Sequence, residues 1–191
     1  MEEKKILMIV GDYGEDYEIM VPYQSLQMVG HQVDAVCPKK EAGEKIITAV
    51  HDDGGAQTFD EKPGHKFTLN ASFNEIEPEQ YDALLLPGGR APEYLRTYSK
   101  VIEYINHFIN EEKPIAAVCH AMQLLIATGK MDGRNCTCVK EVKADAESAG
   151  VSWNDETTID KNLVTAQTWE DHPEWLAEFL SILGTEINHD V

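Results

Sequence analysis

Cys119 is the residue of this sequence best placed to act as a nucleophile. It directly follows the apolar run at 114–118, which is typical of a buried strand, and precedes a segment at 120–128 with helical character. A thiol at a strand-to-helix turn meets the positive end of the helix and free N–H groups, which favour thiolate and can hold an oxyanion. We therefore expect the pKa of Cys119 to lie well below the ordinary thiol value. A buried structural cysteine is also compatible with this position.

Glu18 is the candidate proton partner of this thiol. It lies at the end of the loop at 11–18, which follows the apolar run at 6–10. A carboxyl beside a thiolate in a half-dry cleft stays partly protonated, so it can donate a hydrogen bond to sulfur or move a proton. The helix dipole alone also favours acids in a first helical turn, and this is the only role that we expect for Glu15 and Asp16.

Three further residues follow the apolar run at 83–86. Gly88 and Gly89 let the backbone approach a ligand and form a nest of N–H groups, although a plain tight turn is equally compatible with them. Glu93 stands at the start of the next predicted helix. It is either a pocket carboxylate or an acid near the helix cap.

Two histidines are candidates for the edge of the same site. His120 is next to Cys119, but neighbours on a sharp turn often point apart, so His120 need not be the base. His172 precedes Pro173 at a predicted helix start. It could line a pocket, although its position alone favours a surface residue near a helix cap.

Alternating strands and helices must position these residues. Apolar runs predict strands at 6–10, 33–37, 83–86, 114–118, near 137–139, and at 151–153 and 163–165, with helices at 16–29, 92–110, 120–128, near 141–149 and at 173–183. Glycines and prolines within 39–80 indicate an excursion, such as a hairpin beside the main sheet. This order predicts one α/β domain over residues 1–191, with a mostly parallel sheet covered by helices on both faces. Sites in such folds lie at the carboxyl ends of the strands, so the three loops can converge there.

The composition excludes several partner classes. The chain has 191 residues and a formal net charge of −18, which repels nucleic acid and anionic membrane surfaces. No apolar run approaches the ~20 residues that span a bilayer, and the N-terminus lacks signal-peptide features, so we expect a cytoplasmic protein. The four cysteines do not indicate a disulfide framework, and the Cys136–Cys138 pair lacks the further ligands of a metal site.

Three motifs together resemble the ThiJ/PfpI superfamily. They are GDYGEDYE at 11–18, LPGGRAPEY at 86–94 and AVCHAMQLL at 117–125. The segments TAVHD at 48–52 and GHKFTLN at 64–70 are most similar to the plant glyoxalase branch, in which two such domains occur in tandem. The resemblance covers nearly the whole chain. It implies a single class I glutamine amidotransferase-like domain with a flavodoxin-like three-layer sandwich, and a homo-oligomer of two or more subunits.

The same resemblance implies roles for particular residues. Cys119 would be the nucleophile, Glu18 its proton partner and Glu93 a further pocket carboxylate, with no metal and no cofactor. In the protease branch, the histidine after the cysteine belongs to a triad, and it would correspond to His120. The superfamily usually has glycine after Cys-His where this chain has Ala121. That methyl group could narrow the turn or tilt the oxyanion donors.

The leading functional hypothesis is a cofactor-independent glyoxalase that converts methylglyoxal or glyoxal to a 2-hydroxy acid. Cys119 would form a hemithioacetal, Glu18 would move the proton between carbons, and backbone N–H groups near Gly89 and Ala121 would hold the oxyanion. Deglycation of amines uses the same first step, so the sequence does not distinguish a deglycase from a glyoxalase. The alternatives are an intracellular peptidase or amidase that uses Cys119 and His120, and a cysteine redox sensor or stress chaperone without turnover.

Overall fold

The main sheet has six strands in the order β2-β1-β5-β6-β10-β9, and only β9 runs antiparallel to its neighbour. The computed structural model describes residues 2–52 and 54–186, so both ends of the expected domain and residue 53 lie outside the described residues. The strands are β1 (Lys5–Ile9), β2 (Gln32–Val36), β3 (Lys45–Asp52), β4 (Asp60–Thr68), β5 (Ala83–Leu86), β6 (Ile115–Val118), β7 (Asn135–Cys136), β8 (Ser152–Trp153), β9 (Thr158–Asp160) and β10 (Leu163–Ala166). The helices are α1 (Asp16–Met28), α2 (Ala91–Leu95), α3 (Ser99–Asn110), α4 (Met122–Ala127), α5 (Lys143–Ser148) and α6 (His172–Ile182).

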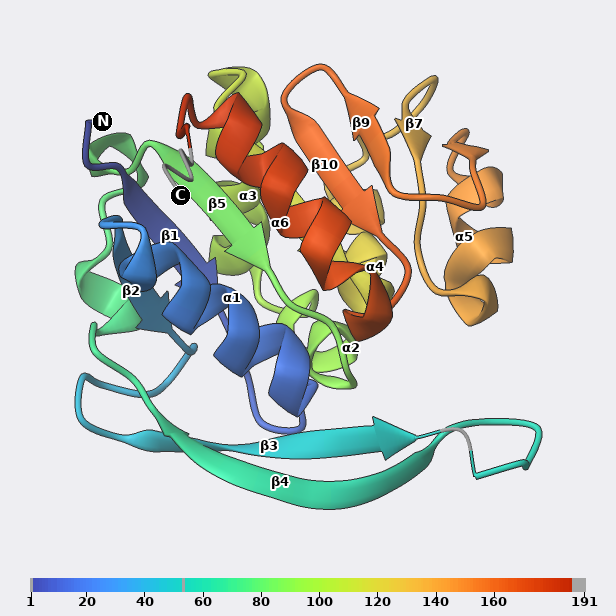
Figure 1. Ribbon diagram of the computed structural model, residues 1–191, viewed down its shortest axis with the longest axis horizontal. Coiled ribbons are helices and arrows are strands. Elements are labelled where there is room, and N and C mark those ends of the chain that lie inside the picture. The colour runs from blue at the N-terminus through green and yellow to red at the C-terminus, as the bar shows by residue number, and fades with distance from the viewer. Residues whose placement is uncertain (1, 53, 187–191) are drawn as a thin grey trace, which may run out of the picture.

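Helices cover both faces of this sheet. Figure 1 shows α1 and α6 in front of the central strands and α3 and α4 behind them. The central strands β5 and β6 are buried along their whole length, as expected for short apolar runs with helices on both sides. The predicted flavodoxin-like three-layer α/β sandwich is therefore confirmed. No helix in the described part of the chain is long and apolar enough to cross a bilayer.

Three elements differ from the sequence-based prediction. The helix expected over 92–110 is two helices, because Tyr98 has an extended backbone (φ −94°, ψ 114°) and starts α3 anew. The strand expected near 137–139 lies at β7 and pairs with β8 in a separate two-stranded sheet. Thr137 donates its N–H to the Thr165 hydroxyl instead of a strand partner. Strand β9 was not predicted, and it joins β10 through a tight turn in which Lys161 has φ 57°.

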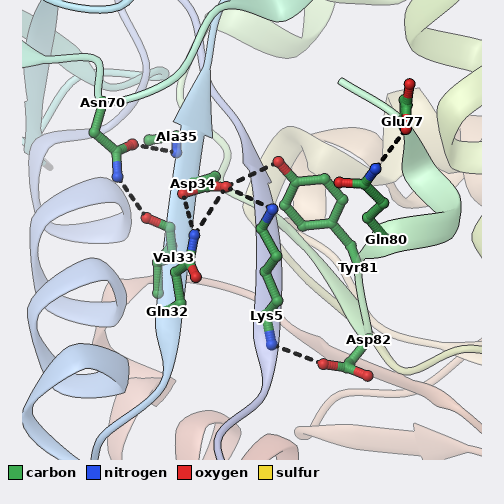
Figure 2. Close-up of polar contacts among 10 residues, drawn as sticks. All are labelled: Lys5, Gln32, Val33, Asp34, Ala35, Asn70, Glu77, Gln80, Tyr81 and Asp82. Atoms are coloured by element: carbon green, nitrogen blue, oxygen red, sulfur yellow. Dashed lines mark hydrogen bonds and ion pairs between the residues drawn. The ribbon is translucent and has the colours of Figure 1, made fainter. Parts of the chain in front are cut away.

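The outer edge of β2 is closed by a side chain. Asn70 accepts a hydrogen bond from the Ala35 N–H (2.7 Å) and donates one to the Val33 carbonyl (2.8 Å), as Figure 2 shows. Between these two residues of β2, the Asp34 side chain accepts a hydrogen bond from the Tyr81 hydroxyl (2.9 Å) and forms an ion pair with Lys5 (3.4 Å). An edge strand whose free backbone groups are bonded in this way is a poor template for a foreign strand.

The expected excursion is a long antiparallel hairpin of β3 and β4, which runs past the end of the sheet beside α1 (Figure 1). Asp16, in the first turn of α1, anchors it. The Asp16 carboxylate accepts hydrogen bonds from the Thr48 hydroxyl and from the His65 N–H (3.0 Å). A Cβ atom at Gly64 would lie 2.5 Å from the Thr48 hydroxyl oxygen, so glycine is needed for this close approach. The hairpin is therefore fixed to the start of the helix that carries Glu18.

We predict that Asp16→Ala loosens the hairpin while the main sheet stays protected. The change leaves the exposed His65 N–H without this acceptor and leaves the Thr48 hydroxyl with only the His65 carbonyl to bond, and each lost hydrogen bond is worth about 0.5–1.5 kcal/mol. Amide hydrogen exchange should speed up over β3 and β4 and change little in β5 and β6. Asp16→Asn keeps an acceptor oxygen and should recover part of the protection. Unchanged exchange in the hairpin of Asp16→Ala would show that other contacts hold it.

Candidate active site

A pocket of about 220 Å³ lies at the carboxyl ends of the central strands. The loops after β1, β5 and β6 form its floor, the hairpin contributes its outer wall, and the segment before α6 closes one side. Its lining residues are Glu15, Glu18, His51, Thr58, Phe59, Glu61, Gly89, Arg90, Glu93, Cys119, His120, Thr168 and Trp169. The sequence-based expectation that three loops converge on one site agrees with this arrangement.

Cys119 occupies a strained backbone position directly after β6. Its φ angle is +60°, in the left-handed region that residues other than glycine rarely adopt, and its side chain is 9% exposed. Such strain costs on the order of 1–3 kcal/mol and occurs preferentially at functional sites. The following residues form a short 3₁₀ turn, Cys119–Ala121, which leads into α4. The cysteine therefore has the geometry of a nucleophile on a sharp strand-to-helix turn.

Glu18 lies fully buried beside this thiol. One carboxylate oxygen accepts a hydrogen bond from the Gly88 N–H (2.8 Å), and the carboxyl group also lies within hydrogen-bonding reach of the Cys119 sulfur. Burial, followed by repulsion from the Glu15 carboxylate, raises the pKa of Glu18 to about 8. At neutral pH Glu18 is thus mainly a carboxylic acid that can donate a proton.

The expectation of a lowered Cys119 pKa is wrong. Burial, together with repulsion from an ionised Glu18, raises the pKa of the Cys119 thiol well above its ordinary value. The N–H groups of Gly89 and His120 bond the sulfur and act in the opposite direction, but they do not offset complete burial. The helix that was expected to stabilise the thiolate is also short, since α4 has only six residues.

His120 also contacts the sulfur at hydrogen-bonding distance. Its Nδ1 lies 3.3 Å from Sγ of Cys119. Burial lowers the pKa of His120, so the imidazole is neutral at neutral pH. The resting site therefore holds a neutral thiol, a neutral imidazole and a protonated carboxyl, with no thiolate–imidazolium ion pair.

The glycine pair allows two loops to meet beneath the pocket. Gly89 has φ +70° and forms an isolated bridge with Gly14, and the Gly88 carbonyl accepts the Glu15 N–H (3.3 Å). A Cβ atom on Gly88 would lie 2.6 Å from Cβ of Cys119 and 2.7 Å from the Glu18 carboxylate. Glycine is therefore required at 88 for the acid and the thiol to approach each other.

Two of the other predicted residues line the pocket. Glu93, an exposed residue in the first turn of α2, is one, and Gly89 on the pocket floor is the other. Gly88 and Ala121 do not line it, and the role of Ala121 as an oxyanion donor stays a prediction. Ala121 has φ −58° and ψ −21°, which alanine adopts without strain, and the effect of its methyl group on the oxyanion donors stays a prediction.

His172 is neither at the surface nor in the pocket wall. It is the first residue of α6, is 4% exposed and stacks on Trp175 with ring centroids 5.4 Å apart. Burial lowers its pKa to about 4, so the ring is neutral. On this side the pocket is lined by Thr168 and Trp169 instead.

Sequence reasoning missed several pocket residues. Glu15 was assigned only to the helix start, and its carboxylate does accept the Glu18 N–H (2.8 Å), but it also lines the pocket. Burial raises its pKa to about 7. His51 stands within the TAVHD segment at 48–52, but neither it nor Glu61, which also comes from the hairpin, was expected to have a role in the site. Arg90 stood within a quoted motif, but no role was inferred for it.

We predict that Glu18→Gln stabilises the protein increasingly as pH rises. Because the folded pKa of Glu18 is raised from 4.5 to about 8, the native state holds this proton more tightly than the unfolded chain. Wild-type stability therefore falls between about pH 4.5 and pH 8 on account of this group, by a few kcal/mol at about 1.4 kcal/mol per pKa unit. The measurement is thermal unfolding of both proteins from pH 5 to pH 9. A constant difference in Tm would contradict the raised pKa.

We predict that iodoacetamide labels Cys119 slowly at pH 6 and faster as pH rises. Cys119 should still react before Cys37, Cys136 and Cys138, because it alone of these lines the pocket and all four pKa values are raised by burial. Glu18→Gln should move the labelling profile to lower pH, since an amide brings no repelling charge. Peptide mapping by mass spectrometry follows each site. Equal wild-type labelling rates at pH 6 and pH 9 would contradict the buried-thiol assignment.

Comparison with known proteins agrees with these features. The model of the DJ-1/PfpI family matches residues 4–182. Protein DJ-1 homolog D of Arabidopsis thaliana is 46% identical over 190 residues, which is 97% of this chain and 49% of the relative. Protein/nucleic acid deglycase 2 of Escherichia coli is 36% identical over 183 residues, covering 95% of this chain and 98% of the relative. The chain thus spans about half the length of its Arabidopsis relatives and nearly all of the bacterial one.

A solved structure has the same fold at low sequence identity. Drosophila melanogaster DJ-1beta aligns with a TM-score of 0.76 at 17% identity, covering 97% of this chain and all of that chain. The family match over residues 4–182 and the identity to full-length relatives show that the chain belongs to the DJ-1/PfpI family.

Proposed function

We propose that this chain is a cofactor-independent enzyme of the glyoxalase or deglycase type that acts on methylglyoxal or glyoxal. The observation that carries this proposal is the buried pair of Glu18 and Cys119, an acid and a thiol in contact at the floor of a small pocket. The names of the relatives from Pyrococcus abyssi and Escherichia coli support it, since both are called deglycases. A pocket of about 220 Å³ suits a small dicarbonyl compound.

The first step joins Sγ of Cys119 to the aldehyde carbon. Glu18 donates its proton to the carbonyl oxygen and accepts the thiol proton, so the carboxyl returns to its acid form as the hemithioacetal forms. The N–H groups of Gly89 and His120 bond the sulfur and stabilise the charge that builds on it during attack. No free thiolate is needed at the start, which agrees with the raised pKa of the thiol.

The second step is a proton transfer between adjacent carbons. Glu18 first releases its proton to solvent. As a carboxylate it then removes the proton from the former aldehyde carbon and returns it to the neighbouring carbon through an enediol, while the hydroxyl proton on the former aldehyde carbon passes to the oxygen of the neighbouring carbon. A carboxylate whose pKa is raised to about 8 is a stronger base than an exposed one. The product is a thioester of a 2-hydroxy acid on Cys119. Addition of water breaks the C–S bond, releases the acid and restores the thiol.

A second candidate is a cysteine peptidase or amidase, and the 3.3 Å contact between Cys119 and His120 favours it. In that reaction His120 would take the thiol proton and pass it to the leaving amine. Two features disfavour it. The lowered pKa of His120 makes it a poor proton acceptor, and the hairpin residues Thr58 and Phe59 line a pocket that is small for a peptide chain.

We predict that Glu18→Gln lowers kcat on methylglyoxal by about 10²–10⁴-fold, the usual worth of general acid–base catalysis. The amide keeps the shape and a hydrogen-bond donor but cannot accept and return a proton, so KM should change less. Cys119→Ala should abolish turnover. The matched control is Glu174→Gln, which removes an exposed acid from the first turn of α6 and should retain wild-type kinetics.

Steady-state kinetics on methylglyoxal and on a peptide amide separate the two candidates. A peptidase would lose more activity with His120→Ala than with Glu18→Gln, and its activity would be seen on the amide. Near wild-type turnover of methylglyoxal by Glu18→Gln would exclude the mechanism proposed above.

A further inference from the structure

A chain of three side chains joins the hairpin to the loop after β5. Glu61 on β4 accepts two hydrogen bonds from the Arg90 guanidinium, at 2.9 Å and 2.7 Å. The guanidinium also lies over the ring of Tyr13, 4.6 Å from its centroid. On its other side Glu61 contacts Nε2 of His51 at 3.2 Å, and the two residues are directly opposite each other in the β3–β4 pairing. Arg90, Glu61 and His51 all line the pocket that contains Cys119.

This arrangement fixes the tautomer of His51. The hydrogen bonds from Arg90 lower the pKa of Glu61, which is therefore an ionised carboxylate that can only accept hydrogen bonds. Nε2 of His51 must then be the donor in the contact with Glu61. In the neutral ring Nδ1 carries no proton, so it presents a free lone pair. An imidazole whose far nitrogen is held by a carboxylate is the usual arrangement of an oriented general base.

Nδ1 of His51 is buried and has no hydrogen-bond partner among the described residues. A buried acceptor left unpaired costs about 1–3 kcal/mol, and because His51 lines the pocket, a ligand or water molecule that reached Nδ1 from there would relieve this cost. Two other groups in the pocket that can move a proton are already engaged. Glu18 is bonded to the Gly88 N–H, and Nδ1 of His120 contacts the Cys119 sulfur.

We propose that His51 is a catalytic base for the last step of the reaction, the hydrolysis of the thioester on Cys119. Nδ1 of His51 accepts a proton from water as the water oxygen forms a bond to the thioester carbon. The C–S bond then breaks, and the imidazolium returns the proton to the sulfur. Glu61 and Arg90 are positioning residues that hold the ring and its tautomer. This inference rests on the proposed function, because it needs the thioester intermediate.

The test is a comparison of His51→Gln with the wild type on methylglyoxal. Hemithioacetal formation and proton transfer do not use His51, so the variant should form the thioester and then stall, with kcat lower by about 10²–10⁴-fold. Intact mass should show an adduct on Cys119 that survives desalting. Neutral hydroxylamine should remove it as a hydroxamate, which identifies a thioester and excludes a reversible hemithioacetal.

Three further variants separate a loss of catalysis by His51 from a loss of folding or of hairpin structure. His51→Ala should be rescued in part by added imidazole, which separates lost chemistry from lost folding. Glu61→Gln should also accumulate the thioester, because it no longer fixes the tautomer of His51. His65→Gln is the matched control: it removes an exposed histidine from the same hairpin, keeps the backbone N–H bond to Asp16, and should neither accumulate an adduct nor respond to imidazole.

The outcomes are distinguishable. Slow turnover with a hydroxylamine-sensitive adduct in His51→Gln, and imidazole rescue of His51→Ala, would support the assignment. Wild-type turnover by His51→Gln, or slow turnover without the adduct, would overturn it and leave the proposed function intact. An adduct of the same kind in His65→Gln would also overturn it, because hairpin placement would then explain the effect. Absence of methylglyoxal turnover in the wild type would overturn the proposed function and this inference together.

Discussion

The contact between the protonated carboxyl of Glu18 and the thiol of Cys119 is the interaction on which the rest of the site depends. Both groups are buried, so ionising both at once is strongly disfavoured, and the raised pKa values of the two groups express this constraint. An acid that keeps its proton at neutral pH can hand it to a carbonyl oxygen. The low accessibility that makes the thiol a weak acid also makes the carboxyl a useful proton donor and, once ionised, a strong base.

This contact requires a backbone that most sequences cannot adopt. Gly88 must lack a side chain because a Cβ atom would meet both the thiol and the acid, while Cys119 holds a left-handed backbone conformation without being glycine. Strain of this kind persists only where the surroundings impose it. Here β6 is buried along its whole length and paired on both sides, by β5 and β10, so the strand end cannot relax. The stability of the sheet thus maintains the geometry of the nucleophile.

The sequence predicted the parts of the site that local pattern determines. The parallel sheet, Cys119 at its turn and Glu18 near the start of α1 follow from apolar runs and their order along the chain. Burial depth does not follow from such patterns. For this reason the pKa of Cys119 was expected to be lowered when it is raised, and His172 was expected at the surface when it is buried. His51 and Glu61 were missed because only the three-dimensional course of the hairpin brings them to the pocket. Strand β9 was missed for a related reason, since its turn at Lys161 lacks the usual glycine.

The hairpin and the acid–thiol pair are physically coupled. Asp16 anchors the hairpin at the first turn of α1, and Glu18 follows two residues later on the same turn. At its other end, the hairpin is joined to the loop after β5 by Glu61 and Arg90, two residues after Gly88, which donates a hydrogen bond to Glu18. The hairpin is therefore held both to the helix that carries Glu18 and to the loop after β5, and its residues His51, Thr58, Phe59 and Glu61 line the pocket that contains the acid–thiol pair.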